Sequence, residues 1–90
     1  MYQVIFTDSY QKLAEKWIKK HSNIKEKYYN TLRVMESNPF HNSLRLHKLR
    51  GAMSEYYSVS IDMRYRIIID FIIEEDKITP INIGDHSIYN

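Results

Sequence analysis

The sequence predicts an α+β domain in which two helices cover one face of a small antiparallel sheet. Apolar residues return at helical spacing between residues 13 and 35 and then alternate with polar residues from residue 44 onward. The connections between the later segments are short, which favours an antiparallel meander. Helical and strand patterns that are segregated along the chain in this way are typical of α+β domains.

The chain is long enough for one domain only. A chain of 90 residues buries too little surface for two independent cores, so residues 1–90 are expected to form a single domain. Apolar residues make up 43% of the sequence and charged residues 27%, with two glycines and two prolines. This composition excludes a disordered, collagen-like or low-complexity chain.

We expect a cytoplasmic protein with no membrane segment. The longest apolar stretch, residues 67–73, is interrupted by Asp70, and the start at Met1 lacks the basic and long apolar runs of a signal peptide. The sequence has no cysteine, and therefore neither a disulfide framework nor a thiolate metal site, which favours the cytosol.

The N-terminal half is predicted to be a strand followed by a helical hairpin. Residues 2–7 alternate as in a strand, and Asp8 or Ser9 is expected to cap the first helix. Asn23 is the expected cap of the second helix, which ends at Asn38 because the next residue is proline.

The C-terminal half is predicted to form about four strands, at residues 44–50, 56–62, 65–73 and 78–83. Pro80 has no N–H to donate, so the last strand is expected to be an edge strand or to bulge there. Every second residue of segment 65–73 is apolar, and this face should receive the helices. Ser58, Ser60 and Arg66 then project from the opposite, exposed face.

Two histidines and an arginine are the candidate chemical groups on that exposed face. His47 and His86 are expected to approach each other across it, with Arg66 between them. One imidazole can take the proton of a ribose 2′-hydroxyl, another can protonate the leaving 5′-oxygen, and the guanidinium can hold the charged phosphorane. Such cleavage of RNA requires no metal and no cofactor.

Simpler interpretations of the same residues stay open. The histidines can be inert surface residues, and Arg66 can pair with Asp62. The basic segment 45–66 suits a polyanion, but it can also be an ordinary solvated strand face. A zinc site of His47, Asp85 and His86 matches no known ligand spacing, so no metal site is expected.

Four segments together carry a family resemblance. They are residues 38–51, 56–61, 65–68 and 83–86, with the motifs LHKLRG, YRII and IGDH among them. In this order they resemble the RelE/ParE toxin superfamily, and within it most closely the RelE, YoeB and YafQ ribonucleases. The resemblance covers essentially the whole chain, including the N-terminal strand and the helical hairpin.

The resemblance implies a toxin of a type II toxin–antitoxin pair. Such a toxin enters the ribosomal A site and cuts messenger RNA by 2′-hydroxyl attack, leaving a 2′,3′-cyclic phosphate, and a cognate antitoxin is its protein partner. By position, His47 is the candidate general base, Arg66 the phosphate clamp and His86 the general acid. Tyr89 resembles the terminal aromatic residue that stacks on or orients the substrate.

Some positions depart from the family pattern. RelE has lysines on the strand that here carries Ser58 and Ser60, and many relatives place the terminal aromatic one residue further on than Tyr89. The residues expected to bind RNA or the ribosome are Arg45, Lys48, Arg50, Ser58, Ser60 and Arg64. Two alternatives remain: a ParE-like inhibitor of DNA gyrase without nuclease activity, and an RNA-binding or structural module without activity.

Overall fold

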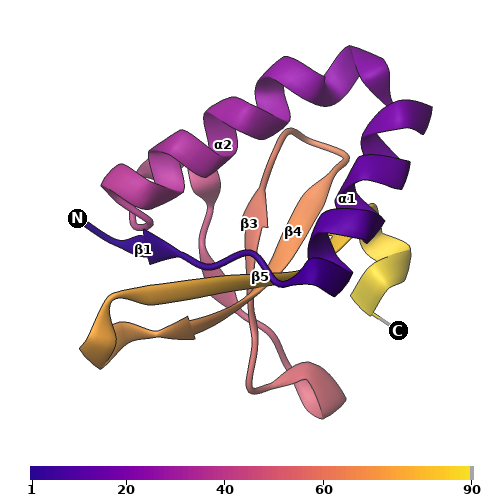
Figure 1. Ribbon diagram of the computed structural model, residues 1–90. Helices are drawn as coiled ribbons and strands as arrows, with labels where there is room; N and C mark the ends of the chain where they lie inside the picture. Colours follow the sequence, from indigo (N-terminus) through magenta and orange to yellow (C-terminus); the bar gives the residue numbers. More distant parts are fainter. Residues whose placement is uncertain (90) are drawn as a thin grey trace.

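Two helices pack on one face of a five-stranded sheet (Figure 1). The computed structural model describes residues 1–89. The helices and strands are β1 (Gln3–Val4), α1 (Asp8–Lys20), α2 (Lys25–Ser37), β2 (His47–Lys48), β3 (Tyr57–Ser60), β4 (Arg66–Ile72) and β5 (Lys77–Gly84). The predicted α+β class and the order of one strand, two helices and four strands are confirmed. No helix within residues 1–89 is long and apolar enough to cross a bilayer.

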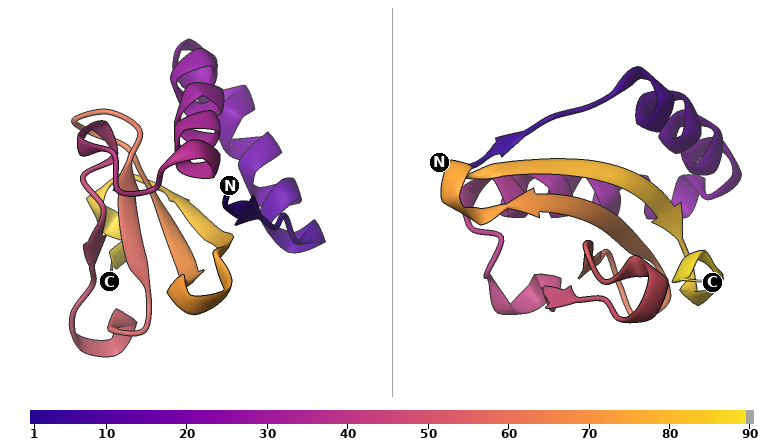
Figure 2. Two further views of the ribbon diagram at one scale, coloured as in Figure 1. Left: turned by 90° about the vertical axis from the view of Figure 1, so that its left-hand side faces the viewer. Right: turned by 90° about the horizontal axis from the view of Figure 1, so that it is seen from below.

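The strands lie in the order β1-β5-β4-β3-β2. Strands β2 to β5 form the predicted antiparallel meander, whereas β1 runs parallel to β5. The helical hairpin is the connection that carries the chain away from β1, and the further views in Figure 2 show both helices on the same side of the sheet. The opposite face is therefore left to the loops and the C-terminal turn.

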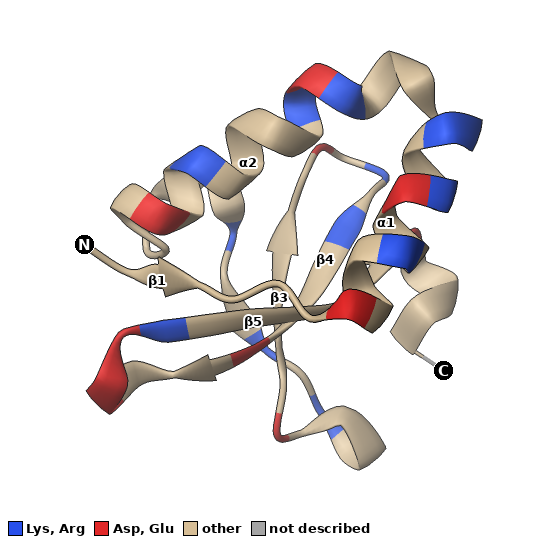
Figure 3. Cartoon of the chain, viewed as in Figure 1, with Lys and Arg blue, Asp and Glu red and all other residues tan. Residues whose placement is uncertain are grey.

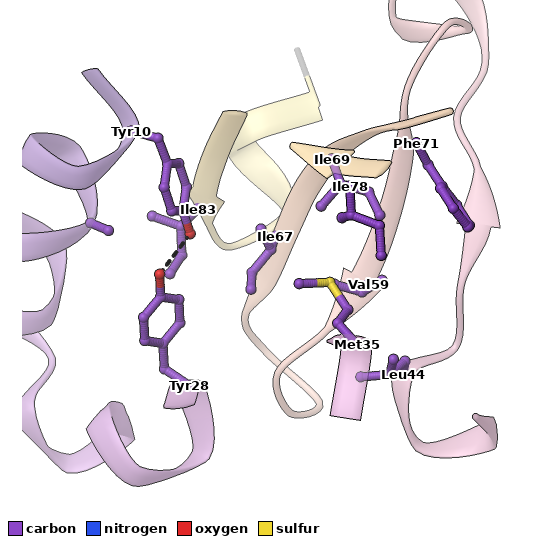
Figure 4. Packing of buried hydrophobic residues seen from close by; sticks show 11 residues of the cluster. Tyr10, Tyr28, Met35, Leu44, Val59, Ile67, Ile69, Phe71, Ile78 and Ile83 are labelled. Carbon is purple, nitrogen blue, oxygen red and sulfur yellow. Dashed lines mark hydrogen bonds between the residues drawn. The ribbon is translucent and has the colours of Figure 1, made fainter. Parts of the chain in front are cut away.

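The core lies between the helices and the inward face of β4 (Figure 4). Ile67 and Ile69 are fully buried and Phe71 is 6% exposed, so the prediction that this face receives the hairpin is confirmed. From α1 and α2, Tyr10 and Met35 pack into the same cluster. Burial of this apolar surface, at about 25 cal/mol per Å², supplies the main force that holds the helices on the sheet.

A buried tyrosine pair joins the two helices. The hydroxyls of Tyr10 and Tyr28 are 3.0 Å apart and hydrogen-bonded, as Figure 4 shows. Burial raises the pKa of both phenols, with the neighbouring tyrosine as a smaller cause for Tyr10. Both side chains therefore remain neutral, and the hydrogen bond fixes the separation of α1 and α2.

Both predicted helix caps are wrong. Helix α1 is capped one residue earlier, by Thr7, whose Oγ1 accepts a hydrogen bond from the backbone N–H of Tyr10 at 3.1 Å. Asn23 lies inside a 3₁₀ turn at Ser22–Ile24 that leads directly into α2, which has no side-chain cap. The continuous turn leaves Asn23 within helical backbone rather than at its beginning.

One strand prediction is corrected by local backbone geometry, and the prediction of an edge strand or a bulge at Pro80 is confirmed in its second alternative. Segment 44–50 is a strand only at His47–Lys48, because a 3₁₀ turn at Asn42–Leu44 is followed by Arg45 in the left-handed conformation (φ 48°). Strand β5 lies inside the sheet, but it does bulge: Ile68 is paired with Asn82 and Ile69 with Pro80. β1 reaches only as far as Ile78, so the missing N–H of Pro80 costs no ladder bond.

We expect Met35→Ala to destabilise the fold by about 2–5 kcal/mol, because it leaves a cavity in a site that is fully buried. Met63→Ala is the matched control, since Met63 is 75% exposed and its loss should change the free energy of unfolding by less than about 0.5 kcal/mol. Urea denaturation followed by circular dichroism measures both. Equal losses in the two variants would contradict this assignment of the core.

Candidate active site

Arg66 begins β4 and projects from the face of the sheet opposite the helices. In the register it lies between Ser60 of β3 and Gly84 of β5. Its Nη1 donates to Ser60 Oγ at 3.3 Å and its Nη2 donates to His86 Nε2 at 3.1 Å. The remaining donor, Nε, is buried and has no hydrogen-bond partner among the residues described. The guanidinium is thus held in place with donor capacity to spare.

No carboxylate neutralises this cation within the described part of the chain. The ion pair found in residues 1–89 joins Lys77 to Glu75 at 3.3 Å, and Arg66 has no acidic oxygen within 4.0 Å. Figure 3 shows acidic residues gathered at the turn between β4 and β5, far from the C-terminal turn. A half-buried guanidinium without a counter-charge is suited to bind an anion such as a phosphate through its Nη groups.

His86 reaches Arg66 through a tight turn that follows β5. Gly84 permits the turn, because a Cβ at this position would lie 2.7 Å from Cγ2 of Ile88. The carboxylate of Asp85 then accepts hydrogen bonds from the backbone N–H and the hydroxyl of Ser87, at 3.0 and 2.7 Å. Since Nε2 of His86 accepts from Arg66, the imidazole is neutral in this arrangement and carries its proton on Nδ1.

Tyr89 closes the C-terminal turn over the sheet. Its hydroxyl is hydrogen-bonded to Ser58 Oγ at 2.6 Å, and its ring stands edge-on to the His86 ring with 5.6 Å between centroids. Ser58 is therefore fully buried and Ser60 is 5% exposed. The prediction that both serines are exposed is wrong, because Tyr89 covers one and Arg66 occupies the hydroxyl of the other. Contact of either serine with RNA stays a prediction.

His47 lies on the same face but apart from the other groups. It is exposed on β2 and paired in register with Ser58, and its Nδ1 donates to the carbonyl oxygen of Arg45 at 3.0 Å. Strand β3 separates β2 from β4, so His47 lies two strand spacings, about 10 Å, across the sheet from β4. In the register it is also offset by two residues from Arg66. Within residues 1–89 no hydrogen bond or ring contact joins His47 to His86, and the approach of the two imidazoles stays a prediction.

The remaining basic candidates are exposed but do not form one cluster with Arg66. Lys48 alternates with His47 and so lies on the other face of β2, while Arg45 and Arg50 flank the strand. Arg64 lies in the turn between β3 and β4, with its guanidinium 5.2 Å above the ring centroid of Tyr65. In the described residues, no three acidic or histidine side chains are placed to hold a metal ion. The binding roles stay predictions.

Two contacts of this site were not predicted from the sequence. The hydrogen bond between Ser58 and Tyr89 joins residues 31 positions apart, and no local pattern indicates it. The contact of Asp85 with Ser87 does have a local signal, since an aspartate two residues before a serine commonly accepts from its backbone N–H.

Comparison with known proteins identifies the fold. No protein-family model matches the chain, and neither does any curated protein sequence. Solved structures do match over nearly the whole length of both chains. YafQ from E. coli strain BL21(DE3) is 12% identical with a TM-score of 0.76, covering 98% of this chain and 97% of YafQ.

Two further structures extend the match. The YoeB/ParE toxin from Agrobacterium tumefaciens is 22% identical with a TM-score of 0.66, covering 93% of this chain and 98% of the toxin. A chain of the E. coli DinJ–YafQ toxin–antitoxin complex is 15% identical with a TM-score of 0.74, covering 97% and 94%. The chain therefore has the α+β fold of these toxins. Its structural neighbours are of the YoeB and YafQ type, as the sequence resemblance indicated.

We expect Ser87→Ala to raise the pKa of Asp85 toward its ordinary value of 3.8, because the Ser87 hydroxyl is the main cause that holds this pKa low. A carboxyl whose pKa is lowered by folding stabilises the turn above its unfolded pKa, and this contribution disappears as the pH falls through the folded pKa. A ¹³C NMR titration of the Asp85 carboxyl measures the change. Ser37→Ala, in α2, is the control, and an unchanged Asp85 titration in Ser87→Ala would refute the assignment.

Proposed function

We propose that the chain is the toxin of a type II toxin–antitoxin pair and acts as a ribosome-dependent endoribonuclease on messenger RNA. The observation that carries the proposal is the half-buried Arg66 guanidinium, which contacts His86 and has no carboxylate partner in the described residues. The likeness to YoeB and YafQ structures supports the toxin role, and the motifs of the sequence support the nuclease role.

In the proposed reaction the scissile phosphate binds at Arg66. The two Nη groups offer donors to the non-bridging oxygens, and this contact strengthens as charge develops on the phosphorane. The ribose 2′-oxygen attacks phosphorus, the bond to the 5′-oxygen breaks, and the product ends in a 2′,3′-cyclic phosphate. One proton leaves the 2′-hydroxyl and one is delivered to the departing 5′-oxygen, so the step is balanced.

The two histidines serve as the proton carriers. His86 lies beside Arg66 and is the general acid. In the structure its Nε2 accepts a hydrogen bond from the guanidinium. When a phosphate binds the guanidinium instead, Nε2 can take up the proton that it later donates. His47 is the general base: its Nδ1–H is held by the Arg45 carbonyl, so Nε2 is the nitrogen that presents a lone pair. The substrate has to span β3, which separates His47 from Arg66 and the His86 imidazole bound to it.

A cognate antitoxin is the proposed partner, and the groove between α1 and α2 is its proposed docking site. A hollow of about 490 Å³ lies there, lined mainly by aromatic and aliphatic residues, and its charged residues are Lys19, Lys25 and Glu15. Phe6 is 40% exposed and Tyr29 44% exposed along this groove. An acidic, amphipathic segment fits this combination, and the similar YafQ chain has been solved in the DinJ–YafQ toxin–antitoxin complex.

We expect induction in bacteria to stop growth and translation. His86→Ala and Arg66→Ala should each relieve the arrest, since loss of a general acid or a phosphate ligand lowers the cleavage rate by about 10²- to 10⁴-fold. Primer extension on translated messages should show cuts within codons for the wild-type chain and none for the variants. Arg33→Ala, an exposed arginine of α2, is the matched control and should arrest growth as the wild type does.

Other outcomes of this experiment have distinct meanings. Arrest that survives both substitutions would remove Arg66 and His86 from the mechanism. Filamentation with DNA damage, in place of message cleavage, would favour the gyrase inhibitor. Absence of any growth effect would favour a module without activity.

We expect Tyr29→Glu to weaken antitoxin binding by about tenfold, because it replaces an aromatic anchor of the groove with a charge that repels an acidic segment. Cleavage should be unaffected, since α2 and the site lie on opposite faces of the sheet. Leu13→Glu is the control: this α1 residue is 38% exposed and does not line the groove. Calorimetry with the antitoxin encoded beside the toxin measures both, and equal affinities would contradict the docking site.

A further inference from the structure

Ser58 is a buried polar residue that the proposed reaction does not use. It lies on β3, is fully buried, and is paired in register with the equally buried Ile68 of β4. Its hydroxyl makes one side-chain hydrogen bond, to the hydroxyl of Tyr89 at 2.6 Å. The bond therefore anchors the last described residue of the C-terminal turn to the middle of the sheet.

The anchored ring in turn stands against His86. The Tyr89 and His86 rings meet at 82° with centroids 5.6 Å apart, an edge-to-face contact of favourable geometry. On its other side His86 accepts from Arg66. His86 is exposed and lies in a short turn, so these two contacts are what limit the freedom of its imidazole.

We propose that Ser58 is a positioning residue for His86. It acts through Tyr89: the serine hydroxyl fixes the phenol, and the ring holds the imidazole at Arg66. Tyr89 is accordingly a support for the general acid rather than a free stacking platform for RNA, because its hydroxyl is already engaged with a buried partner. This inference rests on the proposed nuclease function.

A serine suits this position better than an apolar residue of similar size. Its neighbour on β4 is the buried Ile68, and an apolar residue in place of Ser58 would leave the Tyr89 hydroxyl without this partner. A single short hydrogen bond restricts both the distance and the angle at which the Tyr89 hydroxyl meets the sheet. Ser60, the next residue on the same face of β3, donates or accepts nothing at Tyr89 and instead contacts Arg66. The two serines thus hold the two halves of the Arg66–His86 pair.

The first measurement follows His86 without RNA. In ¹⁵N NMR spectra of the purified chain, Ser58→Ala and Tyr89→Phe should both shift the His86 Nε2 signal and increase the motion of the ring. Tyr89→Phe keeps the aromatic ring and removes only the hydroxyl, so it remains informative if Ser58→Ala folds poorly. Thr31→Val is the control, because it removes another buried hydroxyl, bonded to the carbonyl of Lys27 at 2.7 Å, away from the site.

The second measurement is cleavage of a defined message on ribosomes. Ser58→Ala and Tyr89→Phe should each lower kcat on the order of tenfold with little change in KM, as expected when a proton donor is slightly misplaced. The double variant should be no worse than either single variant, because both remove the same hydrogen bond. Thr31→Val should keep the kcat of the wild type.

Each result decides one of the two proposals. If the wild type cleaves and Ser58→Ala leaves both kcat and the His86 signal unchanged, the positioning role is overturned. Additive losses in the double variant would also overturn it, since the residues would then act separately. If the wild type does not cleave, the nuclease proposal fails, and the His86 signal alone shows whether Ser58 positions this ring.

Discussion

The strict alternation of side chains along β4 links the core of this protein to its candidate site. Ile67 and Ile69 face the helices and are fully buried, so Arg66 and Ile68 must face the other way. A slip of one residue would carry the arginine beneath the helices and expose the isoleucines. The hydrophobic effect that packs the hairpin on the sheet thereby also fixes the face on which the guanidinium stands.

That fixed guanidinium is the least satisfied group of the site. A buried donor without a partner costs about 1–3 kcal/mol, and Arg66 Nε is such a donor within residues 1–89. The neighbours that it does have, Ser60 and His86, are neutral in this arrangement. An arriving phosphate would supply the missing negative charge beside this guanidinium.

The sequence predicts those parts of the fold in which a periodic pattern is long enough to fix a face. The alternation around Ile67 gave β4 its correct orientation, and with it the placement of Arg66. The predictions that fail depend either on the backbone conformation of a single residue or on contacts between residues far apart in the sequence. Arg45 adopts a left-handed conformation that no apolar period marks, so β2 is shorter than predicted. The burial of Ser58 depends on Tyr89, which reaches it only because Gly84 lets the chain fold back.

The position of His47 bears on why the proposed reaction would require a ribosome. Two strand spacings, about 10 Å, and an offset of two residues in the register separate it from Arg66. Within the described residues no hydrogen bond or ring contact joins the two imidazoles. The proposed catalytic groups therefore do not surround one common binding position. The RNA has to reach from one group to the other in one particular conformation. A flexible free strand would lose much conformational freedom to do so. A messenger RNA already held on the ribosome would have lost that freedom beforehand, which favours cleavage there over cleavage of free RNA.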